Sequence, residues 1–276
     1  MEAIILYIVL FCIGTVFGSF FTLAVYRLPL HQDITHERSY CPKCNHKLSF
    51  WDMIPIVSYI ALGGKCRYCK EKIRIRYLLL EVMSGLVFAL FGMSIHMSLW
   101  NITIDTMVYL IAGLLYIAGL IIIAGIDKER KEIHKGVLLY ETIIITLYMI
   151  YLCIIEDMTI YRYVIYVFAI LILQILDTYY FKKHLKNSYV INILILACLM
   201  AAFQSEVTFI ITAIGTLLAI AIDEIIEKIV SAHIKYKKID KKETKKIPIG
   251  FYLCTIQIVA VLILNFLACG WLNEVY

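Results

Sequence analysis

Long apolar stretches recur along the whole chain, and they limit its possible folds more than any other feature. A helix needs about 20 predominantly apolar residues to cross a hydrocarbon core of about 30 Å, and it satisfies its own backbone hydrogen bonds there. The expected fold is therefore an all-α polytopic membrane protein with about eight transmembrane helices. We predict these helices at residues 3–26, 77–98, 106–126, 137–155, 162–181, 188–204, 207–227 and 247–269.

The charge distribution predicts how these helices are oriented. Charged residues make up only 17% of the chain, below the quarter or so that is usual in soluble domains. Lysine and arginine gather in alternate connections, at 27–76, 128–135, 182–186 and 228–246. Because cytoplasmic loops carry an excess of these residues, we expect both termini outside and the basic segments in the cytoplasm. The net charge of +5 then indicates contact with anionic membrane lipid and requires no nucleic acid.

Four of the nine cysteines form two CxxC pairs, "CPKC" (Cys41 and Cys44) and "CRYC" (Cys66 and Cys69). Two such turns about twenty residues apart are typical of a structural four-thiolate zinc site. Disulfides are the alternative, but they are rare in the reducing cytoplasm, where we expect this loop. The other five cysteines lie singly in apolar runs and are interpreted as small buried hydrophobes.

The resulting domain organisation has three parts. Residues 1–26 are the first transmembrane helix, because this stretch lacks the basic start and cleavage site of a signal peptide. Residues 27–76 are a small cytoplasmic zinc-ribbon-like insertion, whose folding would depend on the metal. Residues 77–276 are a seven-helix membrane domain.

Several motifs in the first third resemble one known family. They are "GSFFTLAVYRLP" from Gly18, "CPKCNHKLSFWDMIPIVSYIALGGKCRYC" from Cys41, and "IRIRYLLLE" ending at Glu81. A late "IPIGFYL" from Ile247 is similar to a further segment of that family. In these motifs and in its helix layout, the chain resembles the type IV prepilin peptidases.

The resemblance implies a function and its partners. Such a protein is an aspartic endopeptidase of the bacterial inner membrane, and it removes the leader of type IV prepilin or pseudopilin-like substrates at the cytoplasmic face. It then methylates the new N-terminus with S-adenosylmethionine, and its zinc is structural. The peptidase site would lie within residues 77–276.

The family's peptidase step uses two aspartates. Aspartic proteolysis needs a pair of carboxyl groups, one acting as base on water and the other as acid on the carbonyl oxygen. The resemblance assigns the first to Asp127, which follows the apolar run "IIIAGI". A helix-end carboxylate paired with Arg130 or Lys131 is the alternative interpretation.

The second aspartate of the family lies in a Gly-x-Gly-Asp motif about 64 residues further on. Here that region reads "LKNSYVINILIL" and contains no acid; its nearest polar residues are Ser188 and Asn192. Asp177 and Asp223 lie near the expected cytoplasmic ends of their helices, where a charge is costly unless it is paired or functional. We expect Asp223 or Asp177 to be the second acid, with a slight preference for Asp223, although lysine-paired side chains at these positions are also possible.

Glu81 closes the third motif, and an acid there would orient or deprotonate the amine that receives the methyl group. Its alternative role is a carboxylate that interacts favourably with the start of a helix. The missing second motif leaves another function open, a peptidase-inactive family member that keeps methyl transfer or only binds and chaperones pilin-like helices.

Overall fold

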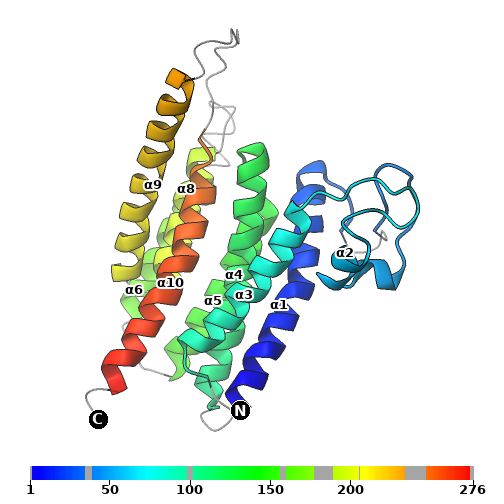
Figure 1. Cartoon of the computed structure of the whole chain (residues 1–276). Helices are drawn as coiled ribbons and strands as arrows, with labels where there is room; N and C mark the ends of the chain where they lie inside the picture. Colours follow the sequence, from blue (N-terminus) through cyan, green and yellow to red (C-terminus); the bar gives the residue numbers. More distant parts are fainter. Residues whose placement is uncertain are drawn as a thin grey trace. The chain divides into compact units, whose positions relative to one another are not determined.

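The computed structural model describes residues 2–34, 39–97, 102–155, 160–176, 189–204, 206–233 and 247–273, and these contain helices and no strand. The elements are α1 (Glu2–Arg27), η1 (Leu28–Leu30), η2 (Phe50–Met53), α2 (Val57–Ala61), α3 (Arg76–Ser94), α4 (Ile104–Arg130), α5 (Lys135–Ile155), α6 (Ile160–Leu176), α8 (Tyr189–Phe203), α9 (Glu206–His233) and α10 (Ile249–Asn273). Figure 1 shows the long helices and the shorter elements between α1 and α3. The prediction of an all-α membrane protein is confirmed.

The described residues contain six helices that are long and apolar enough to cross a membrane: α1, α3, α4, α5, α9 and α10. The apolar parts of the other two, Val164–Leu176 in α6 and Tyr189–Phe203 in α8, are shorter. At 1.5 Å per residue, α8 is about 22 Å long, which is less than the hydrocarbon thickness. All eight helices lie where the sequence predicts them, but a count of eight membrane spans stays a prediction.

The chain divides into two compact units, Met1–Ile122 together with Leu262–Tyr276, and Ile123–Val261. The first unit contains α1, the cysteine-containing segment and α3. In the second, α8 contacts α5, α6 and α9, and most of its side chains are buried. Each candidate site described below lies within one unit.

Helices α1 and α3 of the first unit pack along one another, and small residues allow the close approach (Figure 1). A Cβ atom at Gly14 would lie 2.6 Å from the carbonyl oxygen of Ser84 and 2.8 Å from Cα of Gly85. At Gly18 it would lie 2.9 Å from Cα of Glu81. Gly14 and Gly18 are four residues apart and thus share a face, the arrangement that membrane helices use to bring their backbones together.

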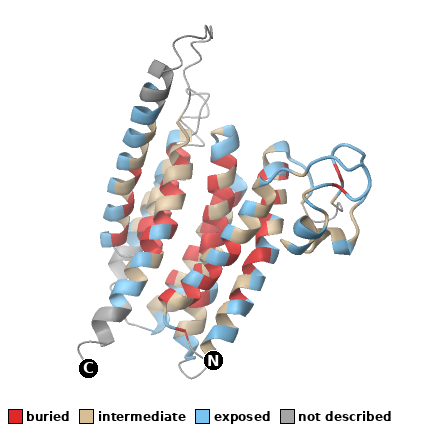
Figure 2. Ribbon diagram, in the orientation of Figure 1, coloured by how far each residue is buried: buried red, intermediate tan, exposed pale blue. Residues whose placement is uncertain are grey.

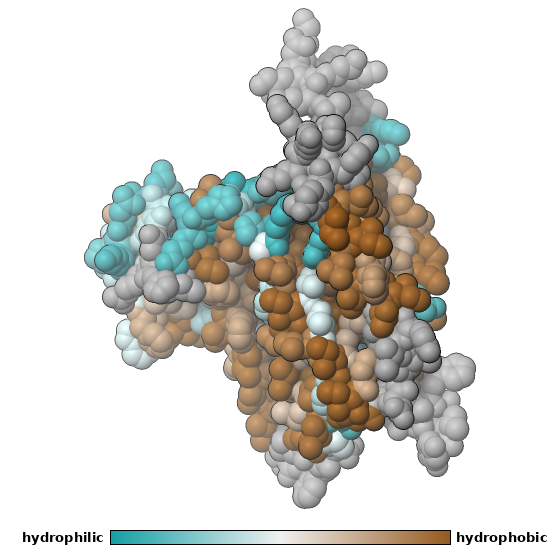
Figure 3. Space-filling model, turned by 180° about the vertical axis from the view of Figure 1, so that it is seen from behind, coloured by the Kyte–Doolittle hydropathy of each residue, from teal (hydrophilic) through white to brown (hydrophobic). Residues whose placement is uncertain are grey.

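The outer face of α1 is apolar and exposed, as the pale-blue positions along this helix in Figure 2 show. Ile4, Ile8 and Val16 are each more than half exposed. Figure 3 shows hydrophobic residues over the helices and hydrophilic residues gathered on the segment between α1 and α3. Apolar surface of this kind is expected where helices face lipid.

Gly14→Ala tests this helix contact. The added methyl group meets backbone atoms that cannot rotate away, so we expect a loss of about 1–3 kcal/mol of stability. Thermal unfolding of the purified protein in mild detergent would measure it. Ile13→Val, on the exposed side of the same helix, is the matched control and should unfold at the wild-type temperature. Equal unfolding temperatures for Gly14→Ala and wild type would contradict the contact.

Candidate functional site

The two CxxC sequences form two turns of the same geometry. In the first, the backbone N–H of Asn45 donates to the carbonyl of Cys41 (2.8 Å), and that of Cys41 donates to His46 (3.0 Å). The second turn repeats this pattern, with bonds from Lys70 to Cys66 (3.0 Å) and from Cys66 to Glu71 (2.8 Å). The fourth residue after each first cysteine, Asn45 or Lys70, has a positive φ, of 55° and 60° respectively. This left-handed corner turns the chain so that both sulfur atoms of a pair face the same side.

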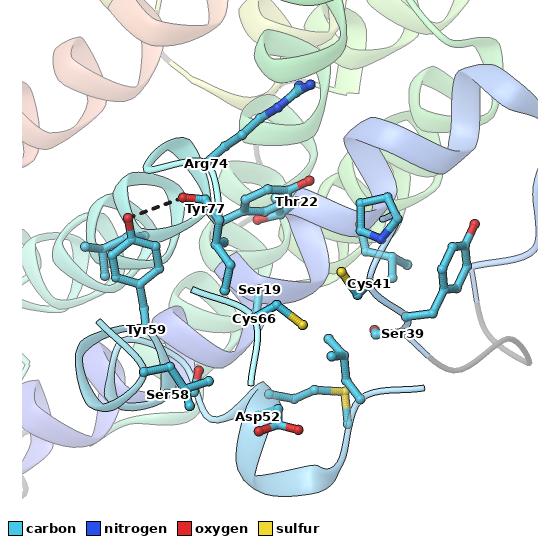
Figure 4. Close-up of a pocket in the computed structure, with 18 of the residues that line it drawn as sticks. Ser19, Thr22, Ser39, Cys41, Asp52, Ser58, Tyr59, Cys66, Arg74 and Tyr77 are labelled. Carbon is cyan, nitrogen blue, oxygen red and sulfur yellow. Dashed lines mark hydrogen bonds between the residues drawn. The ribbon is translucent and has the colours of Figure 1, made fainter. Parts of the chain in front are cut away.

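The four thiols meet in one cluster. The sulfur atoms of Cys41, Cys44, Cys66 and Cys69 all lie within 4.8 Å of one another, and those of Cys41 and Cys69 are 3.8 Å apart. Zinc–sulfur bonds of about 2.3 Å in a tetrahedron require a sulfur separation of about 3.8 Å. Figure 4 shows the side chains of Cys41 and Cys66 on the two neighbouring turns. The four cysteines therefore fit a metal such as zinc, as the sequence predicts.

The surroundings lower the pKa of one thiol in the first turn. Burial opposes ionisation of Cys41, but the backbone N–H groups of Cys44 and Lys43 outweigh it and lower the pKa of the Cys41 thiol to about 7. Thiolate is the form that binds metal.

Asp52 connects the second turn to η2. Its carboxylate accepts hydrogen bonds from Nε of Arg67 (2.6 Å), from the hydroxyl of Tyr68 (3.3 Å) and from Ser49. Burial opposes ionisation, but the hydrogen bonds from Arg67 and Ser49 and the charge of Arg67 outweigh it and lower the pKa of the Asp52 carboxyl. The ring of Tyr68 also lies 3.6 Å from that of His46 in the first turn. These contacts hold the two turns in one small domain.

A pocket of about 500 Å³ lies between this domain and the ends of α1 and α3. Figure 4 shows Thr22 of α1, Tyr59 of α2, and Arg74 and Tyr77 near the start of α3 around it. Its volume is within the range of small-molecule and cofactor sites, and its walls combine aromatic rings with polar groups.

Glu81 lies in the wall of this pocket, one helical turn after Tyr77. Its Oε2 accepts a hydrogen bond of 2.8 Å from the backbone N–H of Ile56. Ile56 directly precedes α2 and has φ of 60°, a conformation that is costly for a β-branched residue. Glu81 therefore holds a strained corner at the edge of the pocket.

Asp127 lies in the second unit and is completely buried near the end of α4. Its Oδ2 accepts a hydrogen bond of 2.9 Å from the backbone N–H of Phe251 and interacts with the hydroxyl of Tyr189. That hydroxyl accepts a hydrogen bond of 3.0 Å from the N–H of Ile249. The first N–H groups of a helix lack partners within the helix and favour negative charge, so the start of α10 supplies donors to Asp127.

The "IPIGF" motif explains how α10 can approach so closely. Pro248 precedes the helix and has no N–H group of its own, which suits a helix start. A Cβ atom at Gly250 would lie 3.2 Å from Cγ and Oδ2 of Asp127, so a larger residue would crowd the carboxyl group. The motif therefore provides both the hydrogen-bond donor and the space that the carboxyl group of Asp127 needs.

Of the residues that the sequence offers for the second acid position, the structure describes Asp223 and Asn192. Asp223 of α9 interacts with the hydroxyl of Tyr252. Asn192, in the region where the resemblance places an acid, donates to the carbonyl of Ile133 (3.3 Å) and so orders the connection before α5. Asp177 and Ser188 lie outside the described residues.

Glu141 is a buried acid that the sequence reasoning missed. Its side chain in α5 is completely buried, and neither carboxyl oxygen has a hydrogen-bond partner in the part of the chain that the structure describes. The signal was present, since Glu141 is the single charged residue within the apolar run 137–155, and such residues are functional candidates by default.

Comparison with known proteins supports these sites unevenly along the chain. A family model described as the bacterial peptidase A24 N-terminal domain matches residues 12–95. A prepilin leader peptidase/N-methyltransferase of Myxococcus xanthus is 43% identical over 79 residues, which are 29% of this chain and 24% of the relative. One from Vibrio cholerae is 42% identical over 85 residues (28% and 34%), and one from Klebsiella pneumoniae is 32% identical over 136 residues (47% and 56%). No solved structure matches the chain.

The segment that matches the family model comprises most of α1, the cysteine cluster and α3. Over this part the chain is similar to the prepilin leader peptidase/N-methyltransferases, as its sequence motifs predict. The matches span from about a quarter to just over half of the length of these relatives.

Cys66→Ser tests the metal site. We expect the purified wild-type protein to contain about one equivalent of a metal such as zinc, and the variant to contain much less, because one of four ligands is lost. Elemental analysis by mass spectrometry measures this directly. Cys12→Ser, a cysteine outside the cluster, should retain the wild-type content. A metal-free wild-type protein whose four clustered cysteines alkylate freely would contradict the site.

Proposed function

We propose that this chain is a prepilin leader peptidase/N-methyltransferase. The observation that carries the proposal is the peptidase A24 N-terminal domain with its intact cysteine cluster, in a chain that also buries Asp127 against the start of another helix. Its substrates are type IV prepilin-like or pseudopilin-like proteins, which enter the membrane domain as helices. It acts in the bacterial inner membrane, with both termini outside and the cysteine domain in the cytoplasm, as the lysine and arginine distribution supports.

Asp127 is one of two carboxyl groups that hydrolyse the leader peptide bond. The oxygen Oδ2 is held by Phe251, so the other oxygen, Oδ1, is the one that addresses water or substrate. Oδ1 is buried and has no hydrogen-bond partner among the described residues. An acid so placed near a helix end suits cleavage just before a hydrophobic substrate helix.

The cysteine domain holds zinc as a structural metal, and its four thiolates leave no open coordination position for chemistry. Metal binding supplies folding energy to a segment with few buried apolar side chains. The pocket beside it is the proposed site of S-adenosylmethionine, which supplies an electrophilic methyl group when bound. Residues such as Tyr77 and Arg74 would hold this cofactor, and Glu81 would orient the new N-terminal amine.

One observation favours a second candidate function. The family's second aspartate motif is absent from the sequence, which is the expected state of a relative that has lost the peptidase step. Such a protein would only methylate, or bind, helices that another enzyme has processed. Leader removal and methyl transfer must therefore be measured separately.

Asp127→Asn is the decisive variant for the peptidase. The full-length protein is reconstituted in lipid vesicles with a prepilin-like protein that has a basic leader, and loss of the leader is followed by mass. Because an amide cannot exchange protons as a carboxyl does, we expect cleavage to fall by about 10²–10⁴-fold. Glu224→Gln, which alters an exposed acid of α9, is the matched control and should cleave at the wild-type rate. Undiminished cleavage by Asp127→Asn would exclude Asp127, and no cleavage by wild type with methylation of a processed substrate would favour the second candidate.

Glu81→Gln tests the methyl-transfer site in the same vesicles. The amide oxygen of glutamine can still accept the hydrogen bond from Ile56, so the loop is preserved while the negative charge is lost. We expect transfer of a labelled methyl group from S-adenosylmethionine to fall at least about tenfold, with leader cleavage unchanged. Equal methylation by the variant and wild type would assign Glu81 only the structural contact.

A further inference from the structure

Glu141 occupies a position that packing alone does not explain. Its neighbours on the buried side of α5 are apolar, namely Val137, Leu138, Ile145 and Met149. A buried polar group without a hydrogen bond is costly, and an ionisable one inside a membrane helix more so. The carboxyl group therefore contributes nothing visible to the stability of the described fold, and a role in chemistry accounts for its presence.

Asp127 and Glu141 share this unusual state. Both are completely buried in the second unit, and each presents at least one carboxyl oxygen without a hydrogen-bond partner in the described part of the chain, Oδ1 of Asp127 and both oxygens of Glu141. The other oxygen of Asp127, Oδ2, is held by the backbone N–H of Phe251, which fixes the position of the carboxyl group.

The two carboxyl groups lie at similar depths on successive helices. Asp127 is three residues before the end of α4, and Glu141 is six residues after the start of α5. At 1.5 Å per residue these positions are about 4.5 Å and about 9 Å from the connection between the helices. The offset is less than one helical turn, and the longer glutamate side chain can compensate for part of it.

Residues of helix α10 interact with both acids. Cys254 is completely buried and lies within electrostatic range of both carboxyl groups. It follows Gly250, which touches Asp127, by one helical turn. Asp127 thus contacts the start of α10, and Glu141 of α5 is near enough to Cys254, one turn further along, to interact with it electrostatically.

We propose that Glu141 supplies the second carboxyl group of the peptidase site, in place of the family's missing aspartate. The inference rests on the proposed peptidase function and identifies the partner that Asp127 needs. One carboxylate takes a proton from water as the water oxygen bonds to the scissile carbonyl carbon, and the other carboxyl gives its proton to the carbonyl oxygen. When the C–N bond breaks, the leaving amine takes up one proton, the diol returns the other, and both carboxyl groups regain their starting states. The two side chains close on water only when substrate fills the space between them, as catalytic contacts often do.

Asp223 is the competing residue. Its carboxylate already interacts with the hydroxyl of Tyr252, and its side chain is only partly buried. Tyr252 is next to Phe251 in α10, so its side chain leaves the helix in a different direction from the face that carries Gly250 and Cys254. These contacts fit a paired residue at a helix surface better than a proton donor beside Asp127.

The test compares Glu141→Gln, Asp223→Asn, Asp127→Asn and the double variant Asp127→Asn/Glu141→Gln in the vesicle assay, with Glu224→Gln as control. We expect leader cleavage to fall at least 100-fold in Glu141→Gln and less than threefold in Asp223→Asn. The double variant should lose no more activity than the more damaging of its two single changes. Groups that act as one unit show this lack of additivity. Binding of uncleaved substrate should be unchanged in Glu141→Gln.

Thermal unfolding separates a catalytic from a structural role. Because the carboxyl group has no hydrogen-bond partner to lose among the described residues, Glu141→Gln and Glu141→Leu should unfold at or above the wild-type temperature. A lower temperature for both, with cleavage lost, would assign Glu141 to the fold and overturn the inference. So would cleavage by Glu141→Gln within tenfold of wild type, or a 100-fold loss confined to Asp223→Asn. An inactive wild-type protein would instead overturn the proposed peptidase function, and the two failures are therefore distinguishable.

Discussion

A carboxyl group inside an apolar helix bundle is costly unless hydrogen-bond donors face it, and the second unit is arranged around this need at Asp127. The donors come from the first N–H groups of α10, directly and through Tyr189 at the start of α8. Three helix ends therefore have to meet at one carboxylate. This explains why a proline and a glycine occur together in the "IPIGF" motif. Pro248 begins the helix without an unpaired N–H group, and Gly250 leaves room for the carboxyl group of Asp127.

In the first unit, the polar segment between α1 and α3 is ordered by a different set of interactions. The segment between α1 and α3 contains only short helices, and most of its side chains are exposed. Its order comes from four convergent thiols, from the hydrogen bonds that Asp52 accepts from three residues, and from the hydrogen bond of Ile56 to Glu81. All of these groups are held at the ends of two helices that already touch through Gly14 and Gly18.

Much of this was predictable from the sequence, because apolar run length and cysteine spacing are local signals. The eight helices lie where hydropathy predicts them, and the two CxxC turns converge as their spacing indicates. The partners of Asp127 were not predictable in this way, since Tyr189 and Phe251 are 62 and 124 residues distant and only packing brings them together. Glu141 was not predicted for a different reason: helix ends and the motif spacing of the family both point elsewhere, whereas this acid lies within an apolar run.

The tight pairing of α1 with α3 also has an evolutionary consequence. The two helices that carry the cysteine domain approach one another backbone to backbone at Gly14 and Gly18, so this contact lies within the hairpin itself. A module closed in this way tolerates extensive change elsewhere in the chain. The match to the family model begins within α1 and ends at residue 95, directly after α3, and so coincides with this hairpin.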